Sequence, residues 1–205
     1  MTNKTEQEIE AKFLVRDLAA VAARLEALGA GITAGRVREI NLRFDTPDGR
    51  LTRDRQVLRL RQDAHAVLTF KGPAKTGESV SIRQEIEFQV SDFQAARHFL
   101  EALGYEVSII YEKFRTTYTY QDLTVVLDEM PFGQFLEIEG PEAASIQKAA
   151  VDLQLDWDAR SVLSYLALFQ ELQVARGISA RNLTFAELQD VQATPEDLGL
   201  RFADH

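Results

Sequence analysis

The chain has 205 residues, of which 45% are hydrophobic and 27% charged, as in a globular protein with a sizeable core. It contains no cysteine, which excludes disulfides and thiolate metal sites, and its net charge of −9 is opposite to that of a general nucleic-acid binder. There is no apolar run long enough for a membrane span and no signal-peptide pattern, so we expect a cytoplasmic protein. Its three histidines, His65, His98 and His205, are scattered and predict no histidine-based zinc site.

The first half of the chain predicts four strands and one helix. The helix at 17–28 has a capping residue at Asp17 and ends at Gly29. The strands are expected at 6–15, 37–45, 56–62 and 66–71.

The second half repeats this pattern. A helix at 92–103 ends at Gly104, and the sequence LEALG closes both helices at an offset of 75 residues. Strands are expected at 82–90, 110–120, 123–129 and 134–140. This internal duplication predicts an α+β protein whose two related sheets form a sandwich or a closed barrel, with amphipathic helices outside.

The C-terminal part predicts more helix. One helical pattern covers 142–154, and a longer helix is expected at 158–175. Its inward residues would be Val162, Leu163, Leu166, Phe169 and Leu172. We expect one domain over 5–175 and a tail of short helices over 176–205, docked on the barrel or on a partner.

Three strands carry the same alternation of acid, isoleucine and acid, and basic strands lie between them. Period two places these charges on one face of the sheets. The acids are Glu8, Glu10, Glu85, Glu87, Asp128, Glu137 and Glu139. The bases are Lys12, Arg59, Arg61, Lys71, Arg83, Lys113 and Arg115. The opposite, apolar faces carry Ile9, Phe13, Leu58, Leu60, Leu68, Phe70, Ile86, Phe88, Phe114, Val126, Leu136 and Ile138.

The charged faces allow two interpretations. They are solvated outer faces with cross-strand ion pairs, or they line a charged interior. Three acidic and three basic strands favour the interior, where the ligand would be a polyanion bridged to carboxylates by divalent cations. Five other bases are expected at the surface, with Arg53 or Arg55 as candidates for a tunnel mouth: Arg43, Arg50, Arg53, Arg55 and Lys75. Tyr165 is expected to be a core anchor and Arg160 a surface charge.

The ordered motifs resemble those of the CYTH domain family, the triphosphate tunnel metalloenzymes. The resemblance covers about residues 5–172. Its motifs are the EIEAK at 8–12, LRLR at 58–61, LTFKGP at 68–73, EIE at 85–87, EKFR at 112–115, LDE at 127–129 and FGQFLEIE at 132–139. The family includes class IV adenylyl cyclases, thiamine triphosphatases, inorganic tripolyphosphatases and RNA triphosphatases.

The resemblance implies an eight-stranded antiparallel β-barrel tunnel that binds a triphosphate with Mg²⁺ or Mn²⁺. The expected metal ligands are Glu8, Glu10, Asp128, Glu137 and Glu139. The expected substrate-binding residues are Lys12, Arg59, Arg61, Lys71, Arg83, Lys113 and Arg115. The residues expected to carry catalysis are Glu8, Glu10, Lys12, Glu85 and Glu87.

The expected reaction is hydrolysis of inorganic tripolyphosphate, thiamine triphosphate or a nucleoside triphosphate. The alternative is a class IV adenylyl cyclase, but the family's cyclases carry a His-Phe pair just before the first motif, where this chain has residues 3–7, NKTEQ. A non-catalytic binding module and a purely structural barrel are the other readings. The expected partner is a small-molecule triphosphate, with no nucleic acid and no membrane, and a homodimer is left open.

Overall fold

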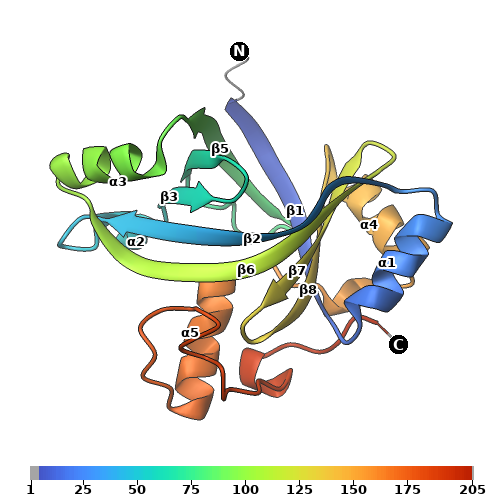
Figure 1. The fold of residues 1–205 in the computed structure, drawn as a ribbon. Coiled ribbons are helices and arrows are strands. Elements are labelled where there is room, and N and C mark those ends of the chain that lie inside the picture. Colours follow the sequence, from blue (N-terminus) through green and yellow to red (C-terminus); the bar gives the residue numbers. More distant parts are fainter. Residues whose placement is uncertain (1–4, 205) are drawn as a thin grey trace.

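The computed structural model describes the backbone of residues 5–204 and the side chains of residues 7–204. Within this range the chain forms eight strands and five α-helices (Figure 1). The strands are β1 (Thr5–Val15), β2 (Gly31–Asp45), β3 (Val57–Gln62), β4 (Ala66–Lys71), β5 (Ser81–Val90), β6 (Glu106–Tyr120), β7 (Leu123–Met130) and β8 (Gly133–Glu139). The helices are α1 (Leu18–Ala27), α2 (Arg50–Arg53), α3 (Phe93–Ala102), α4 (Ala143–Asp152) and α5 (Tyr165–Arg176).

The strands close into one antiparallel ring in the order β1-β5-β4-β3-β2-β6-β7-β8, and β8 pairs back onto β1. Each half of the chain supplies four strands and one long crossover helix, α1 or α3. The first strand of each half pairs with the last strand of the other half. Strand β1 of the first half lies beside β8 of the second, and β5 of the second half lies beside β4 of the first. The prediction of a closed eight-stranded sheet from two related halves is confirmed.

The duplicated helices form for the same local reasons. The Asp17 carboxylate accepts from Ala19 N at 2.8 Å, and that of Asp92 accepts from Ala95 N at 2.9 Å, so each helix has a side-chain N-cap. Both helices end at a glycine in the left-handed region, with φ of +81° at Gly29 and +87° at Gly104.

The helices cover most of the outer face of the ring. Figure 1 shows α1 and α4 together on one side, α3 on another, and α5 below the ring. Phe13 and Ile138 are buried under the first pair, and Leu60 is buried near Leu100 of α3. The outer face of β5 differs from prediction, since Phe88 is 50% exposed and Ile86 39%. No helix in the described part of the chain is both long and apolar enough to cross a bilayer.

The predicted helix over 158–175 is wrong in its first third. Residues Trp157–Ala159 form a 3₁₀ turn, and α5 begins only at Tyr165, after Ser164, whose hydroxyl accepts from Ala167 N. Between them the chain is extended, because Ser161 pairs with the main chain of Lys12 at 2.7 and 3.2 Å. Two of the residues predicted to face inward are therefore exposed, Val162 at 47% and Leu163 at 41%.

Unequal strand lengths explain why the C-terminal residues pack as they do. Pairing of β1 with β5 ends at Glu10, which leaves the rest of that edge of β1 open. Ser161 pairs with it first, and then Ala203, whose N–H donates to Leu14 O at 2.9 Å. Likewise β7 reaches β6 only from Phe114 onward, and Leu183 pairs with the uncovered edge of β6.

The tail contains less helix than predicted. Over residues 178–204 the structure has one helical segment, the 3₁₀ turn Glu196–Leu198. Tertiary packing determines the rest, since Leu183, Leu188 and Leu198 are buried against α5 and the lower ring.

Candidate functional site

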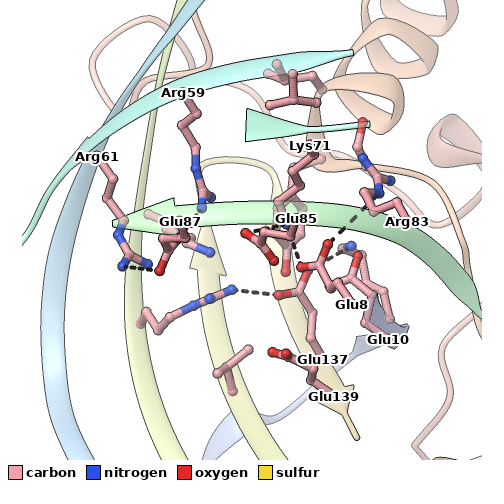
Figure 2. Close-up of a pocket in the computed structure, with 18 of the residues that line it drawn as sticks. Glu8, Glu10, Arg59, Arg61, Lys71, Arg83, Glu85, Glu87, Glu137 and Glu139 are labelled. Atoms are coloured by element: carbon pink, nitrogen blue, oxygen red, sulfur yellow. Dashed lines mark hydrogen bonds and ion pairs between the residues drawn. The ribbon is translucent and has the colours of Figure 1, made fainter. Parts of the chain in front are cut away.

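The charged strand faces turn into the ring and line a cavity of about 250 Å³ (Figure 2). Its acidic lining residues are Glu8, Glu10, Glu85, Glu87, Glu137 and Glu139. Its basic lining residues are Lys12, Arg43, Arg59, Arg61, Lys71, Arg83, Lys113 and Arg115. A strand alternates its side chains between faces, so closing the sheet encloses one whole face of each strand.

Carboxylates gather where β1 meets β8. Strand register places Glu10 beside Glu139 and Lys12 beside Glu137. Burial, and then the charge of Glu137, raises the pKa of Glu10. Burial together with Glu8 and Glu10 raises the pKa of Glu139 to about 7. A cation placed among these carboxylates would relieve their repulsion and lower both pKa values.

Glu8 links this acidic group to the bases on β4 and β5. Its Oε1 lies 2.5 Å from Lys71 Nζ, and its Oε2 lies 4.0 Å from Arg83 Nε. Lys71 also lies 3.5 Å from Glu85 (Figure 2). The buried Oε2 atom of Glu8 has no hydrogen-bond partner among the described residues. Glu8 therefore has one carboxylate oxygen that accepts no hydrogen bond from the described residues.

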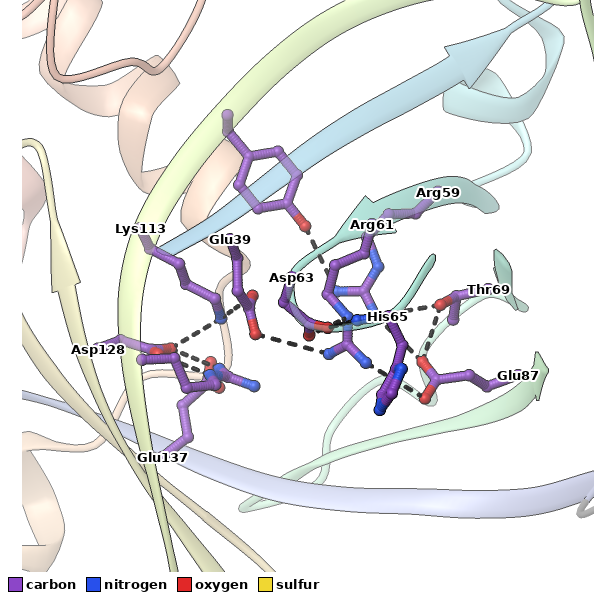
Figure 3. Close-up of polar contacts among 12 residues, drawn as sticks. Glu39, Arg59, Arg61, Asp63, His65, Thr69, Glu87, Lys113, Asp128 and Glu137 are labelled. Carbon is purple, nitrogen blue, oxygen red and sulfur yellow. Dashed lines mark hydrogen bonds and ion pairs between the residues drawn. The ribbon is translucent and has the colours of Figure 1, made fainter. Parts of the chain in front are cut away.

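Asp128 is the centre of a second charged network (Figure 3). It is 0% exposed and accepts from Lys113 Nζ at 3.0 Å, Arg115 Nε at 2.7 Å and the Tyr165 hydroxyl at 2.8 Å. Arg115 also binds Glu137 at 2.6 Å. Both oxygens of Asp128 are therefore already used by side chains of the protein.

Glu39 extends this network toward β3. It is buried and lies 3.5 Å from Lys113 and 3.6 Å from Arg61. Burial alone would raise its pKa, but Lys113, Arg115 and Arg61 lower it to about 2. Glu39 therefore remains ionised and pairs with two of these bases, Lys113 and Arg61, in the wall.

The bases on β3 are held more loosely. Arg61 lies 3.3 Å from Asp63 and 3.7 Å from Glu87, and Arg59 lies 3.4 Å from Glu87 (Figure 3). These separations exceed those of good charge-assisted hydrogen bonds, which are roughly 2.7–2.9 Å. Anionic oxygens of a ligand would compete well for both arginines.

Tyr111 and Arg43 complete this side of the cavity. Arg59 Nη1 donates to the Tyr111 hydroxyl at 3.4 Å. Burial would raise the pKa of Tyr111, but Arg59 and Lys113 lower it. Burial lowers the pKa of Arg43, and the nearby charges of Arg59 and Arg83 add to that effect. This part of the cavity therefore brings Arg43, Arg59 and Arg83 close enough for their charges to repel one another.

The structure brings the predicted site residues together. Every one of them lines the cavity except Asp128, which lies in the wall behind Lys113 and Arg115. Val126, predicted on the apolar face, instead lines the cavity, because its register partner on β8 is Glu137 and the two share a face. The chemical roles of these residues remain predictions.

Sequence reasoning missed several residues. Arg43 lines the cavity and is not the surface charge that was predicted, and Tyr165 is both a core anchor and a lining residue. Glu39, Asn41 and Arg43 alternate along β2 and share its inward face, so period two could have identified them. Tyr165 had no such signal, since α5 positions it from below the ring.

The lining residues suit a hard divalent cation. Mg²⁺ binds through one or two carboxylates together with phosphate oxygens and water, and Mn²⁺ accepts the same ligands. Glu8, Glu10, Glu137 and Glu139 offer such oxygens, and the raised pKa values of Glu10 and Glu139 indicate a site short of positive charge. Among the described residues no three potential ligands converge into a ready-made cage, so oxygens of a substrate would have to complete the coordination.

We expect replacement of Asp128 to lower the free energy of unfolding, because its main role is to pair with buried bases and not to bind metal. Asp128→Asn keeps the shape but removes the buried charge that Lys113 and Arg115 share, and leaves them only Glu39 and Glu137. Removing one partner of a buried ion pair costs about 3–5 kcal/mol, which urea unfolding would measure. Glu129→Gln is the matched control, because its pair with Arg36 is exposed and contributes at most about 1 kcal/mol. Wild-type stability combined with weakened metal binding would instead show that Asp128 is a metal ligand.

We expect Glu139 to reduce stability at alkaline pH. Its pKa is raised from 4.5 to about 7, so between these values the folded state holds a proton that the unfolded state releases, and stability falls as pH rises. Without divalent metal, Glu139→Gln should therefore unfold at a higher temperature than wild type at pH 8. The difference should disappear toward pH 4, although water at this partly exposed position reduces its size. Parallel melting profiles across this pH range would contradict the expectation.

Comparison with known proteins agrees with this architecture. The family model described as the CYTH domain matches residues 6–177. No curated protein matches the chain significantly. An adenylate cyclase candidate from Vibrio parahaemolyticus has a TM-score of 0.71 at 22% identity, over 82% of this chain and 99% of that chain. The PH1012 protein from Pyrococcus horikoshii OT3 has a TM-score of 0.66 at 24% identity, over 78% and 97%.

A third structure comes from Hippeastrum, an adenylyl cyclase candidate described as having a dominant triphosphatase activity. It has a TM-score of 0.63 at 23% identity, over 80% of this chain and 95% of that chain. These likenesses show the shared fold, and the family model covers most of the sequence. The chain therefore belongs to the CYTH domain family.

Proposed function

We propose that this protein is a divalent-metal-dependent triphosphatase that hydrolyses a linear triphosphate inside the ring. The observation that carries the proposal is the lining of the cavity, where bases and carboxylates face one enclosed space. Such a lining suits a ligand that is charged along its whole length and carries a cation. The family's members are enzymes that act on triphosphates, which supports the same class of ligand.

The bases would hold the phosphate chain. Arg59 and Arg61 are best placed for this role, because their present ion pairs are long. Arg83 adds a further guanidinium, and Lys71 and Lys12 add ammonium groups from β4 and β1. Guanidinium groups bind phosphate in a bidentate manner, and fixed positive charge stabilises the phosphoryl oxygens as the bond breaks.

Lys113 and Arg115 would contribute charge from a more rigid position. Both are fixed by Asp128, and Arg115 is fixed by Glu137 as well. A base that is already in place needs no reorganisation when charge develops on the substrate. Asp128 thus supports catalysis by positioning these bases.

The carboxylates would hold the metal and the attacking water. We assign Glu8, Glu10, Glu137 and Glu139 to the metal, and Glu85 and Glu87 to the lining of the cavity on the adjacent strand β5. Bound Mg²⁺ or Mn²⁺ supplies charge neutralisation on the phosphates and a lower pKa for a bound water. Glu87 is oriented by Thr69, whose hydroxyl donates to it at 2.8 Å. Because Glu10 and Glu139 must give up protons, metal affinity should rise with pH.

Hydrolysis is favoured over cyclisation by the character of the lining. Cyclisation of ATP requires an apolar place for adenine. Among the described residues that line the cavity, only Val57, Val126 and Leu166 are aliphatic, so the lining offers little apolar surface. The segment before Glu8 also lacks the His-Phe pair of the family's cyclases.

The second candidate is a class IV adenylyl cyclase, and one observation favours it. An adjoining cavity of about 470 Å³ contains Val80, Val162 and Leu163 and shares Arg43 and Arg83 with the main cavity. A nucleoside could lie there while its phosphates reach the channel. The names of the Vibrio parahaemolyticus and Hippeastrum structures point in the same direction, although the latter is described as mainly a triphosphatase.

The proposed partner is a small-molecule triphosphate and not a nucleic acid. The bases that would bind phosphate lie inside the ring, and the chain as a whole carries a net charge of −9. A cytoplasmic location and a homodimer remain predictions from the sequence.

The direct test is a turnover assay of the purified protein with Mg²⁺ and then Mn²⁺. We expect orthophosphate from tripolyphosphate or thiamine triphosphate, and slower release from ATP. Chromatography would separate orthophosphate, pyrophosphate and cyclic AMP. Equal amounts of pyrophosphate and cyclic AMP from ATP would establish the cyclase instead, and tight binding without turnover would indicate a binding module.

Glu10→Gln should remove metal-dependent turnover while the fold remains intact. It keeps the shape of the side chain and removes a charge that the site already disfavours, so stability should not fall. We expect a loss of roughly 100-fold or more in kcat. Glu106→Gln, at an exposed position on β6, is the control and should leave turnover unchanged. Loss of folding in Glu10→Gln would instead indicate a structural ion pair.

A further inference from the structure

The side chain of Asn41 is buried and unpaired. It is 0% exposed, and neither Nδ2 nor Oδ1 has a hydrogen-bond partner among the described residues. Burying a polar group without a partner costs about 1–3 kcal/mol, and most buried polar side chains in native proteins are paired. An amide that is unpaired at both atoms therefore indicates a function other than stability.

Asn41 belongs to the wall of the cavity. It lies between Glu39 and Arg43 on β2, and its register partners are Arg61 on β3 and Tyr111 on β6. Arg43, Arg61 and Tyr111 all line the cavity. Paired residues on neighbouring strands point to the same face, so the shorter amide lies beneath the longer side chains of Arg61 and Tyr111.

The atoms around Asn41 are short of acceptors. Of the eight buried side-chain atoms without a partner in the described residues, six lie on β2 and β3. Besides the two amide atoms and one oxygen of Glu39, they are the Nε atoms of Arg43, Arg59 and Arg61. This side of the cavity presents several unpaired N–H donors, and a ligand rich in anionic oxygens would satisfy them.

We propose that Asn41 is an additional ligand-binding residue of the channel. Its Nδ2 donates to a phosphoryl oxygen, and its Oδ1 accepts from the Nε–H of a neighbouring arginine that has turned to the ligand. The proposal rests on the triphosphate function proposed above and adds a residue that the charged motifs did not identify.

The side chains over Asn41 are held weakly enough to turn. Arg61 has three carboxylate neighbours at 3.3, 3.6 and 3.7 Å. Tyr111 is joined to Arg59 by a contact of 3.4 Å. A phosphate group offers shorter, charge-assisted bonds to both arginines, and their movement toward it exposes the amide.

The test uses Asn41→Leu, which nearly preserves volume and removes both polar atoms. The free protein should melt at the same or a higher temperature than wild type, because no unpaired polar group remains. Its Kd for tripolyphosphate, measured by calorimetry without metal, should rise about tenfold, as expected for one lost bond to a charged group. Asn41→Ala removes the same atoms with no added bulk, and should show the same rise in Kd if the leucine variant fails to fold.

Thr69→Val is the matched control for stability. Thr69 is also 0% exposed, but its hydroxyl is bonded to Glu87 at 2.8 Å and Arg59 at 3.1 Å, so its loss should lower the melting temperature. If Asn41→Leu lowers the melting temperature in the same way and leaves the Kd unchanged, Asn41 has a structural role and the inference is wrong. If wild type fails to bind tripolyphosphate, the proposed function falls and the inference with it. Binding by wild type and by both Asn41 variants with equal affinity overturns the inference alone.

Discussion

Closure of the sheet is the constraint on which the rest of the structure depends. Once β8 pairs with β1, the charged faces of all strands are enclosed, and each buried charge requires a partner. Two pairs meet this requirement: Lys12 with Glu137 on neighbouring strands, and Lys71 with Glu8 on the two strands that flank β5. Such pairs contribute little to stability after desolvation. The ring therefore encloses an interior whose buried charges are costly, which supports the proposal that a charged ligand binds there.

The two sides of the channel differ in how their buried charges are paired. Where β6, β7 and β8 meet, Asp128 is surrounded by short bonds, and its neighbours are fixed. Along β2 and β3 the contacts of Arg59 and Arg61 are long, and several buried donors have no partner in the described part of the chain. The first side is therefore the more rigid one, and the second is the side where the proposed polyanion would find donors to bind. A preorganised charge opposite an adaptable one is an arrangement suited to holding a substrate and stabilising its transition state.

Much of this arrangement could be predicted from local pattern. Period-two alternation identified the inward acids and bases because charges such as Glu8 and Glu10 repeat at a spacing that only a strand face explains. How deeply each side chain is buried could not be predicted from this alternation. Asp128 and Glu137 look alike in sequence, yet Asp128 is fully enclosed because strand register places Arg115 beside it and helix α5 adds Tyr165. The start of α5 was equally hidden, because it depends on where β5 stops pairing with β1.

The end of a strand pairing also explains how the C-terminal segment is connected to the site. The strand edges left open by shorter neighbours lie beside residues that line the cavity, and later parts of the chain cover them. Ser161 pairs with the main chain of Lys12, and Leu183 pairs with β6 next to Tyr111. Both strands would otherwise expose unpaired main-chain groups at the base of the channel. The segment after β8 therefore covers the open strand edges of the ring. It fixes the backbone of Lys12 and Tyr111, whose side chains line the cavity.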